Sequence, residues 1–251
     1  EKERNFLKEQ KEVLEEELNM AKSIQENLLP SKAPNHSIAF FYKPMAQLGG
    51  DFFDFITFPD STNIGIFLSD VSGHGVPAAF ITSMIKSFLL KAGTTLYYPS
   101  MLMAYLNENL YQQTSGNFIT AFYGIYNKDR NTISYCNAGH NLPFLVEEDL
   151  ISCFSEKNKG LPLAIFSNAD LKSFNKNYRN EKIAIPQKSR MIFYTDGLVE
   201  TVNIQKPEEE DFGIQCLPNL LKTSFNNTPA DCLSLIYEKL LNFRGQTELE
   251  D

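Results

Sequence analysis

Two aspartates stand at the ends of apolar runs in this sequence. The run Ile64–Ser69 stops at Asp70, and the run Met191–Thr195 stops at Asp196. Runs rich in β-branched and aromatic residues are typical of buried strands. A glycine follows each aspartate within a few residues and lets the chain turn sharply while the carboxylate stays at the end of the strand. We therefore expect both side chains to serve a functional site.

Two further aspartates complete the candidate set. Asp51 follows the pair Gly49-Gly50, and Asp251 is the last residue of the sequence. Carboxylates that converge from distant parts of a chain repel one another in a pocket of low dielectric unless cations neutralise them. Ligands that are all oxygen suit hard divalent ions such as Mg²⁺ or Mn²⁺. The residues thus favour a hydrolase with two metal ions.

The same residues also have structural interpretations. Asp70 and Asp196 could cap a helix or a turn after a strand, and Asp51 could be a turn residue. His74 lies between two glycines just after Asp70 and is a candidate for protonating a leaving alkoxide, the alternative being a hydrogen bond that holds its loop. His140 is interpreted as a structural residue that fixes its own turn.

The composition excludes several classes of protein. With 251 residues, 43% of them hydrophobic, the chain can bury the core of one globular domain. A net charge of −8 argues against nucleic acid as a partner. The four cysteines lack C-x-x-C spacing, which indicates a reducing compartment and no thiol-based metal site. No apolar stretch approaches the ~20 residues of a membrane span, so we expect a cytoplasmic protein without direct membrane contact.

Residues 1–29 are predicted to form a long exposed helix, because they are rich in Glu, Lys and Gln and lack Gly and Pro. Apolar residues recur there every seven positions, at Leu7, Leu14, Ala21 and Leu28. This repeat is typical of a coiled-coil linker that pairs with a second copy, and the alternative is one amphipathic helix docked on its own domain. Because the sequence begins with Glu1 rather than Met, we expect a fragment of a longer protein with a sensor domain upstream.

Residues 30–251 alternate mainly between strands and turns. Strands are predicted at 38–42, 52–58, 64–69, 118–126, 132–136, 143–146, 150–154, 181–185 and 190–195, and helices at 77–91, within 99–114, at 214–224 and at 229–243. The strands outnumber the helices and follow one another along the chain. This order favours antiparallel sheets covered by helices, an α+β fold, over a βαβ winding.

Five segments occur in an order that is similar to one protein family. They are Ile24–Pro30, Gly49–Asp54, Asp70–Gly75, Asn137–Asn141 and Tyr194–Leu198. Together they resemble the SpoIIE/RsbU-type bacterial serine/threonine phosphatases of the metal-dependent type 2C class. The resemblance implies an αββα sandwich of two antiparallel sheets flanked by helices and a centre of two Mn²⁺ or Mg²⁺ ions. It also implies a phosphoserine or phosphothreonine substrate on a signalling partner such as an anti-sigma-factor antagonist.

The resemblance assigns metal ligands by position. Asp51 matches the aspartate that bridges both ions, Asp70 and the backbone carbonyl of Val71 match ligands of one ion, and Asp196 matches a ligand of the other. Asp251 matches the first aspartate of a closing pair, so the last strand of the family is expected beyond it. The residues expected to surround these ligands are Gly50, Asp54, Gly73 and Gly197.

The chain departs from the family pattern at Ala164, where glycine is favoured. An alanine there is costly if the backbone needs the freedom of glycine.

Two other functions remain open at this stage. Gly49–Phe53 superficially resembles the Gly-Gly-Asp-Glu-Phe signature of diguanylate cyclases, but it lacks the acidic residue after the aspartate and leaves Asp70 and Asp196 unexplained. The other alternative is a degenerate phosphatase domain that acts as a signalling or scaffold module, because the closing aspartate motif is interrupted at Asp251.

Overall fold

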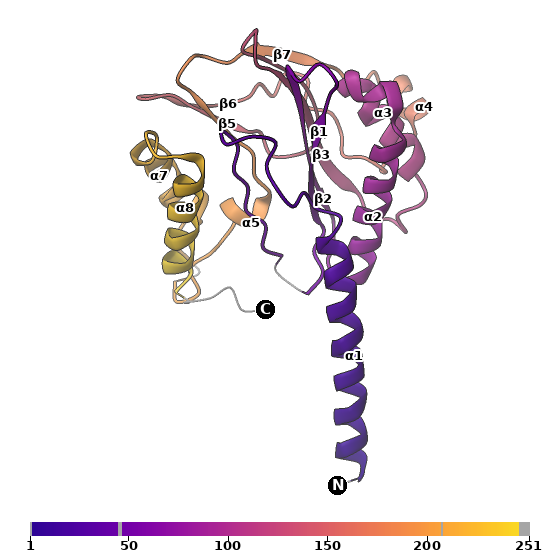
Figure 1. Ribbon diagram of the computed structural model, residues 1–251. Helices are drawn as coiled ribbons and strands as arrows, with labels where there is room; N and C mark the ends of the chain where they lie inside the picture. Colours follow the sequence, from indigo (N-terminus) through magenta and orange to yellow (C-terminus); the bar gives the residue numbers. More distant parts are fainter. Residues whose placement is uncertain (1, 45–46, 207, 246–251) are drawn as a thin grey trace.

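Two antiparallel sheets lie face to face with helices on both outer sides in the computed structural model of this chain, which describes residues 2–44, 47–206 and 208–245 (Figure 1). The layers are therefore helices, large sheet, small sheet and helices. The α+β class and the αββα sandwich predicted from the sequence are confirmed.

The large sheet has five antiparallel strands in the order β1-β2-β3-β4-β7. These are β1 (Asp51–Thr57), β2 (Asn63–Val71), β3 (Ile119–Asn127), β4 (Thr132–Ala138) and β7 (Glu181–Ala184). The first four strands lie in chain order, with β1–β2 and β3–β4 as hairpins and β2 joined to β3 through the long segment 72–118. Side chains alternate between the two faces of each strand, so one face meets helices and the other meets the small sheet.

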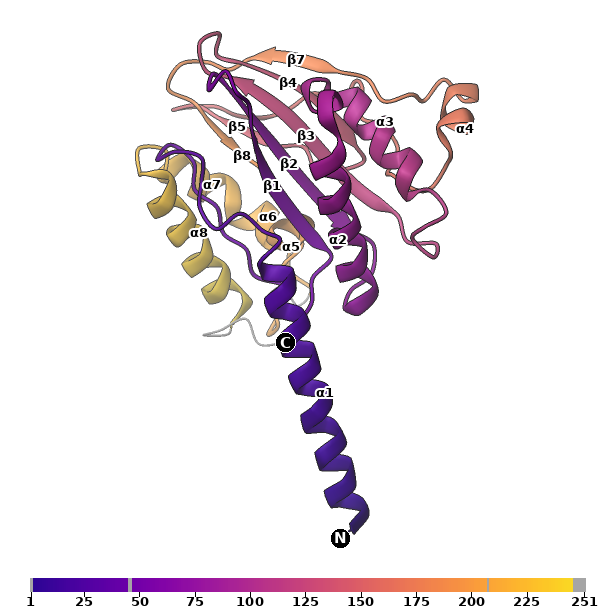
Figure 2. The ribbon, with the colours of Figure 1, turned by 45° about the vertical axis from the view of Figure 1, so that its right-hand side comes forward.

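Two helices, α2 (Val76–Lys91) and α3 (Pro99–Leu110), cover one face of the large sheet (Figure 2). The short 3₁₀ helix η1 (Gly93–Tyr97) joins them, and α4 (Asn168–Ser173) packs beside α3. The buried core between these helices and the sheet includes Phe52, Phe67, Val71, Ile81, Ile85, Leu102, Leu106, Ile119 and Tyr123. Burial of this apolar surface supplies the main driving force that holds the helices on the sheet.

The small sheet has the strand order β6-β5-β8, with β5 at Phe144–Val146, β6 at Ile151–Cys153 and β8 at Arg190–Ile192. Its outer face packs against α6 (Phe212–Gln215), α7 (Leu217–Thr223) and α8 (Pro229–Arg244). The space between the two sheets is filled by a separate core that includes Phe122, Ile133, Tyr135, Leu142, Phe154 and Ile185. The three clusters thus correspond to the three contacts between layers.

The first helix, α1 (Lys2–Glu26), extends away from both sheets (Figure 1). Its side chains are exposed from Lys2 to Glu17, so the alternative of an amphipathic helix docked along its own domain is wrong. Two exposed ion pairs with i,i+4 spacing, Lys8–Glu12 and Lys11–Glu15, support the helix locally. Among the described residues, no helix has the length and apolar character needed to cross a membrane.

The structure corrects three of the predicted elements. Residues 38–42 form no strand, because their aromatic side chains pack on other rings, Phe40 on Phe53 and Phe41 on Tyr237, while their backbone stays outside the ladder. The predicted helix 214–224 is divided into α6 and α7, with Pro218 in the first turn of α7, the position where the missing N–H of proline costs least. The predicted strand 190–195 ends at Ile192.

Candidate active site

Asp51 and Asp70 lie directly opposite each other in the register of β1 and β2. Residues paired in this way project to the same face of a sheet. That face is the one between the sheets, because the neighbours Phe52 and Val71 pack in the core under the helices. Two carboxylates from segments nearly twenty positions apart are thus brought side by side at the beginning of β1.

The carboxylate of Asp51 is only half satisfied by the protein. Its Oδ2 accepts a hydrogen bond of 2.9 Å from the hydroxyl of Thr195, whereas its buried Oδ1 has no hydrogen-bond partner among the described residues. Burial raises the pKa of Asp51 to about 6, against the effect of the Thr195 bond, and repulsion from Asp196 raises it further. A buried carboxylate oxygen without a partner is costly in this state and is suited to a cation.

Asp70 has the same kind of surroundings. Burial, followed by repulsion from Asp51, Asp196 and Glu200, raises its pKa to about 7. Asp196 is the first residue of α5 (Asp196–Val199) and is exposed. The structure therefore brings three of the predicted ligands, Asp51, Asp70 and Asp196, within electrostatic reach of one another.

Two backbone carbonyl oxygens lie close to Gly50, the residue before Asp51. A Cβ atom on Gly50 would lie 2.7 Å from the carbonyl oxygen of Val71 and 3.2 Å from that of Gly73, so only glycine fits there. Gly73 and Gly75 have φ of 89° and 76°, the left-handed region that glycine adopts without strain. His74 is exposed between them. This loop leads directly from β2 into α2.

The donor set fits a hard divalent cation, although the side chains do not complete a site by themselves. In the ranges 2–44, 47–206 and 208–245, no three acidic, imidazole or thiol side chains are close enough together to hold a metal. The unpartnered oxygen of Asp51 and the nearby carbonyl of Val71 are oxygen atoms of the kind that Mg²⁺ prefers, and Mg²⁺ commonly keeps several waters. Asp251 lies outside the described residues.

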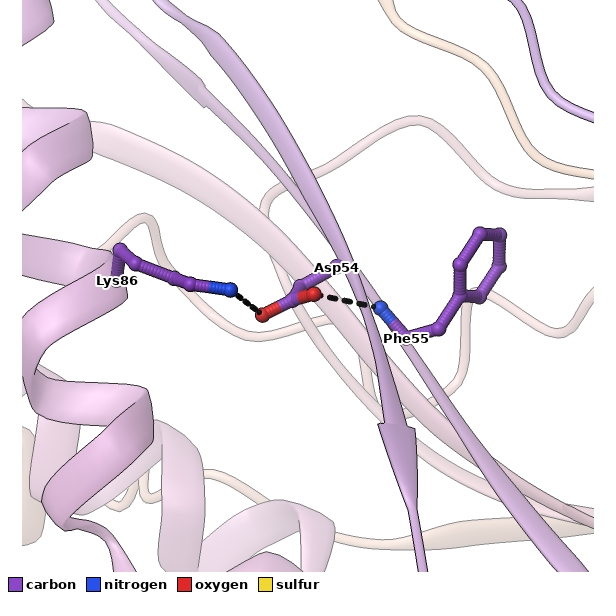
Figure 3. A network of polar contacts seen from close by, with 3 residues as sticks. All are labelled: Asp54, Phe55 and Lys86. Carbon is purple, nitrogen blue, oxygen red and sulfur yellow. Dashed lines mark hydrogen bonds and ion pairs between the residues drawn. The ribbon is translucent and has the colours of Figure 1, made fainter. Parts of the chain in front are cut away.

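Asp54 lies on the other face of β1. Positions three apart on a strand project to opposite faces. Its carboxylate pairs with Lys86 of α2 at 2.7 Å and accepts the backbone N–H of Phe55 at 3.0 Å (Figure 3). The structure thus places Asp54 under the helices and not beside Asp51. Gly197, the remaining predicted neighbour of the ligands, is exposed next to Asp196.

Gln25, near the end of α1, connects this helix to the segment before Asp51. Its Oε1 accepts the N–H of Gly49 at 3.1 Å, and its Nε2 donates to the Gly49 carbonyl at 2.8 Å and to the Thr82 hydroxyl of α2 at 3.1 Å. The sequence analysis did not single out Gln25 or Thr195, although both lie inside the five family-like segments. Their position as polar residues inside these segments is the signal that could have identified them.

An apolar cavity of about 790 Å³ opens next to this site, between β1 and β2 on one side and β8 and α8 on the other. Asp51, Thr195 and Gly197 line one part of it, and aromatic and aliphatic side chains such as Phe53, Ile66, Phe193 and Ile236 line the rest. Of the three carboxylates, Asp51 thus borders this largely apolar cavity.

Comparison with known proteins agrees with this architecture. The family model for "Stage II sporulation protein E (SpoIIE)" matches residues 60–251, and the chain belongs to this family. Phosphoserine phosphatase RsbU of Bacillus subtilis (strain 168) is 28% identical over 239 residues, which cover 92% of this chain and 66% of RsbU. The chain thus spans slightly less than two thirds of that relative.

Two solved structures show the same fold. The PP2C domain of SiaA from Pseudomonas aeruginosa has a TM-score of 0.80 and 16% identity, with 96% of this chain and 94% of that chain covered. RsbX, solved in complex with magnesium, has a TM-score of 0.55 and 15% identity, with 81% of this chain and 83% of that chain covered. The fold is therefore that of PP2C-type phosphatase domains.

Proposed function

We propose that this chain is a metal-dependent protein serine/threonine phosphatase. The observation that carries the proposal is the pair Asp51 and Asp70, two partly buried, mutually repelling carboxylates, one of which has a buried oxygen without a partner among the described residues. Membership of the SpoIIE family and similarity to a phosphoserine phosphatase support the phosphoester as substrate. The diguanylate cyclase alternative has no support in this fold.

The proposed ligands of two Mn²⁺ or Mg²⁺ ions are the side chains of Asp51, Asp70, Asp196 and Asp251 and the backbone carbonyl of Val71. When bound, such ions supply an activated water and neutralise charge on the phosphoryl oxygens. The chain's own part is to hold the oxygens in place. Thr195 orients the Asp51 carboxylate, and Gly50 leaves room for the Val71 carbonyl. His74 is exposed and accessible to a leaving alkoxide.

Metal depletion and return test this proposal. The chelator-treated protein should not hydrolyse p-nitrophenyl phosphate or a phosphoserine peptide, and added Mn²⁺ should restore both activities. Turnover that persists in excess chelator, with no metal found by elemental analysis, would contradict the proposal. A protein that binds Mn²⁺ and still turns over neither substrate would instead support the degenerate signalling module.

The proposed substrate is phosphoserine or phosphothreonine on a folded signalling partner, such as an anti-sigma-factor antagonist, in the cytoplasm. RsbU, the relative described above, is a phosphoserine phosphatase, and this suggests the class of residue. A panel of phosphopeptides and phosphoproteins should show preference for phosphoserine and phosphothreonine over phosphotyrosine. Preference for phosphotyrosine would refute this part of the proposal.

We further propose that residues 1–29 form a linker that pairs with a second copy and transmits a signal from an upstream sensor domain to the phosphatase domain at 30–251. The exposed Leu7 and Leu14 of the seven-residue repeat and the contact of Gln25 with Gly49, two residues before Asp51, support this route. Leu28, the last residue of the repeat, packs instead against the core of the chain's own domain. In the full-length protein, one residue inserted near Glu12 rotates the helix by ~100° and should change regulation, whereas seven inserted residues should preserve it. Equal behaviour of both insertions would reduce the helix to a tether.

A further inference from the structure

A threonine extends the row of aspartates across the large sheet. Thr120 on β3 lies opposite Asp70, as Asp70 lies opposite Asp51. All three side chains therefore project into the space between the sheets. The hydroxyl of Thr120 is 2.8 Å from Nδ1 of His140. The buried imidazole of His140 thus contacts Thr120, the residue that is paired with Asp70.

The backbone of His140 is held firmly in this position. The side-chain amide of Asn137 accepts the N–H of His140 at 2.8 Å and donates to its carbonyl at 3.0 Å. Gly139, with φ of 79°, pairs with Ala121 of β3, and a Cβ on Gly139 would lie only 2.7 Å from the ring of Pro162. These constraints place the imidazole against β3 with 3% of the residue exposed.

The other nitrogen of the ring, Nε2, is buried and forms no hydrogen bond with any described residue. The bond with Thr120 is therefore the polar contact of the ring within the described part of the chain. Burial lowers the pKa of His140 to about 4, so the ring is neutral near pH 7. A neutral imidazole has one donor and one acceptor nitrogen, and Nδ1 can pair with a hydroxyl in either form.

We propose that His140 is a positioning residue of the metal centre, which acts through Thr120. Its hydrogen bond holds the Thr120 side chain in place beside Asp70, on the face of the sheet where the proposed ligands lie. This inference rests on the proposed metal-dependent function. Residues that orient ligands in this way typically change metal affinity by about 10–100-fold when they are replaced.

The test measures Mn²⁺ affinity of the chelator-treated protein by calorimetry, so that it does not depend on turnover. Thr120→Val removes the hydroxyl at nearly constant shape and should weaken binding about 10–100-fold, as should His140→Gln. Thr120→Ser keeps the hydroxyl and should bind close to wild type. Ser224→Ala, which deletes a fully buried hydroxyl in the helical layer over the small sheet, is the matched control and should leave affinity unchanged.

The outcomes separate the two proposals. Equal Mn²⁺ affinity of wild type, Thr120→Val and His140→Gln would overturn the positioning role and leave the phosphatase proposal standing. Loss of affinity in Thr120→Ser as large as in Thr120→Val would overturn it too. If His140→Gln does not fold, the Thr120→Val and Thr120→Ser pair decides. A wild-type protein that binds no Mn²⁺ would overturn the proposed function and this inference with it.

Discussion

The two faces of the large sheet differ in whether the protein supplies a cation for a partly buried carboxylate, and β1 carries one carboxylate of each kind. Asp54 projects toward the helices, where Lys86 pairs with it at 2.7 Å (Figure 3). Asp51, three positions earlier, projects toward the small sheet. There it meets the hydroxyl of Thr195 and further carboxylates, and no described lysine or arginine forms an ion pair with it.

The difference separates stability from function. On the helix face, the fold supplies the cation that a buried carboxylate needs, so the pair is complete without a ligand. On the inter-sheet face, the carboxylates Asp51 and Asp70 raise each other's energy, and the chain leaves their neutralisation to something from solution. Changes on the first face should affect folding, and changes on the second should affect metal binding and turnover.

Asp70→Asn should have the largest effect. A neutral amide is a poor ligand for a hard cation, so we expect phosphatase activity to fall by about 10²–10³-fold. The metal-free variant should be at least as stable as wild type, because the repulsion from Asp51 and Asp196 is removed. Steady-state turnover with Mn²⁺ and urea unfolding in chelator measure the two quantities. Near-normal turnover would show that Asp70 is not a ligand.

The pH dependence of stability should be the next largest effect. The folded-state pKa values of Asp51 and Asp70, about 6 and about 7, lie above the unfolded value near 4. The folded state therefore binds more protons, and the free energy of unfolding of the metal-free protein should fall as pH rises from about 4 to about 7. Added Mn²⁺ should stabilise the protein more at pH 7.5 than at pH 5, since the ligands must lose their protons.

The control for this measurement is the double variant with Asp51→Asn and Asp70→Asn. Its free energy of unfolding should fall less than that of wild type, or rise, as pH increases over the same range, because the lowered pKa of His140 acts in the opposite direction and is still present. Urea unfolding in chelator at several pH values measures the difference between the two proteins. A wild-type slope no more negative than that of the double variant would contradict the electrostatic account of the site.

Much of this comparison could be predicted from the sequence. Apolar runs rich in β-branched and aromatic residues, separated by polar turns, indicated the four strands β1 to β4 of the large sheet, and the sequence also predicted helices at α2 and α8. The strands that end at Asp70 and begin at Asp51 were sufficient to propose that these carboxylates meet. Local patterns sufficed here because neighbouring strands are also neighbours in sequence.

Contacts between distant segments could not be predicted in this way. Residues 38–42 look like a strand by composition, but whether a segment pairs depends on which edge is free. Burial of Gln25 depends on how α1 meets Gly49 and α2, and the contact of Thr120 with His140 depends on the bridge between Ala121 and Gly139 just beyond β4. The different partners of Asp51 and Asp54 likewise became clear only when the two faces of β1 were assigned.

Breaking the ion pair on the helix face should have a smaller effect, on stability alone. Lys86→Met leaves Asp54 without its cation in a partly exposed position, so we expect the free energy of unfolding to fall by about 1–2 kcal/mol. The double variant with Asp54→Asn should recover much of this loss. Mn²⁺ affinity should stay at the wild-type level in both proteins. A large loss of affinity would mean that the two faces of β1 are not independent.

Ala164→Gly should have the smallest effect, and it should be stabilising. Ala164 has φ of 68°, the left-handed conformation in which a Cβ costs about 1 kcal/mol, and the Asn107 side chain of α3 holds it there by accepting its N–H at 2.8 Å. Glycine removes the strain but adds entropy to the unfolded chain, so the net gain should be about 0.5 kcal/mol. Ala104→Gly, within the right-handed helix α3, is the matched control and should lose about 1 kcal/mol of unfolding free energy.

Mn²⁺ affinity should not change in either variant. The segment that contains Ala164 joins the helix side of the sheet through the bridge of Leu163 to Ile119. Urea unfolding and calorimetry on the same samples test both statements. Destabilisation by Ala164→Gly would mean that packing of the alanine methyl group outweighs the backbone strain.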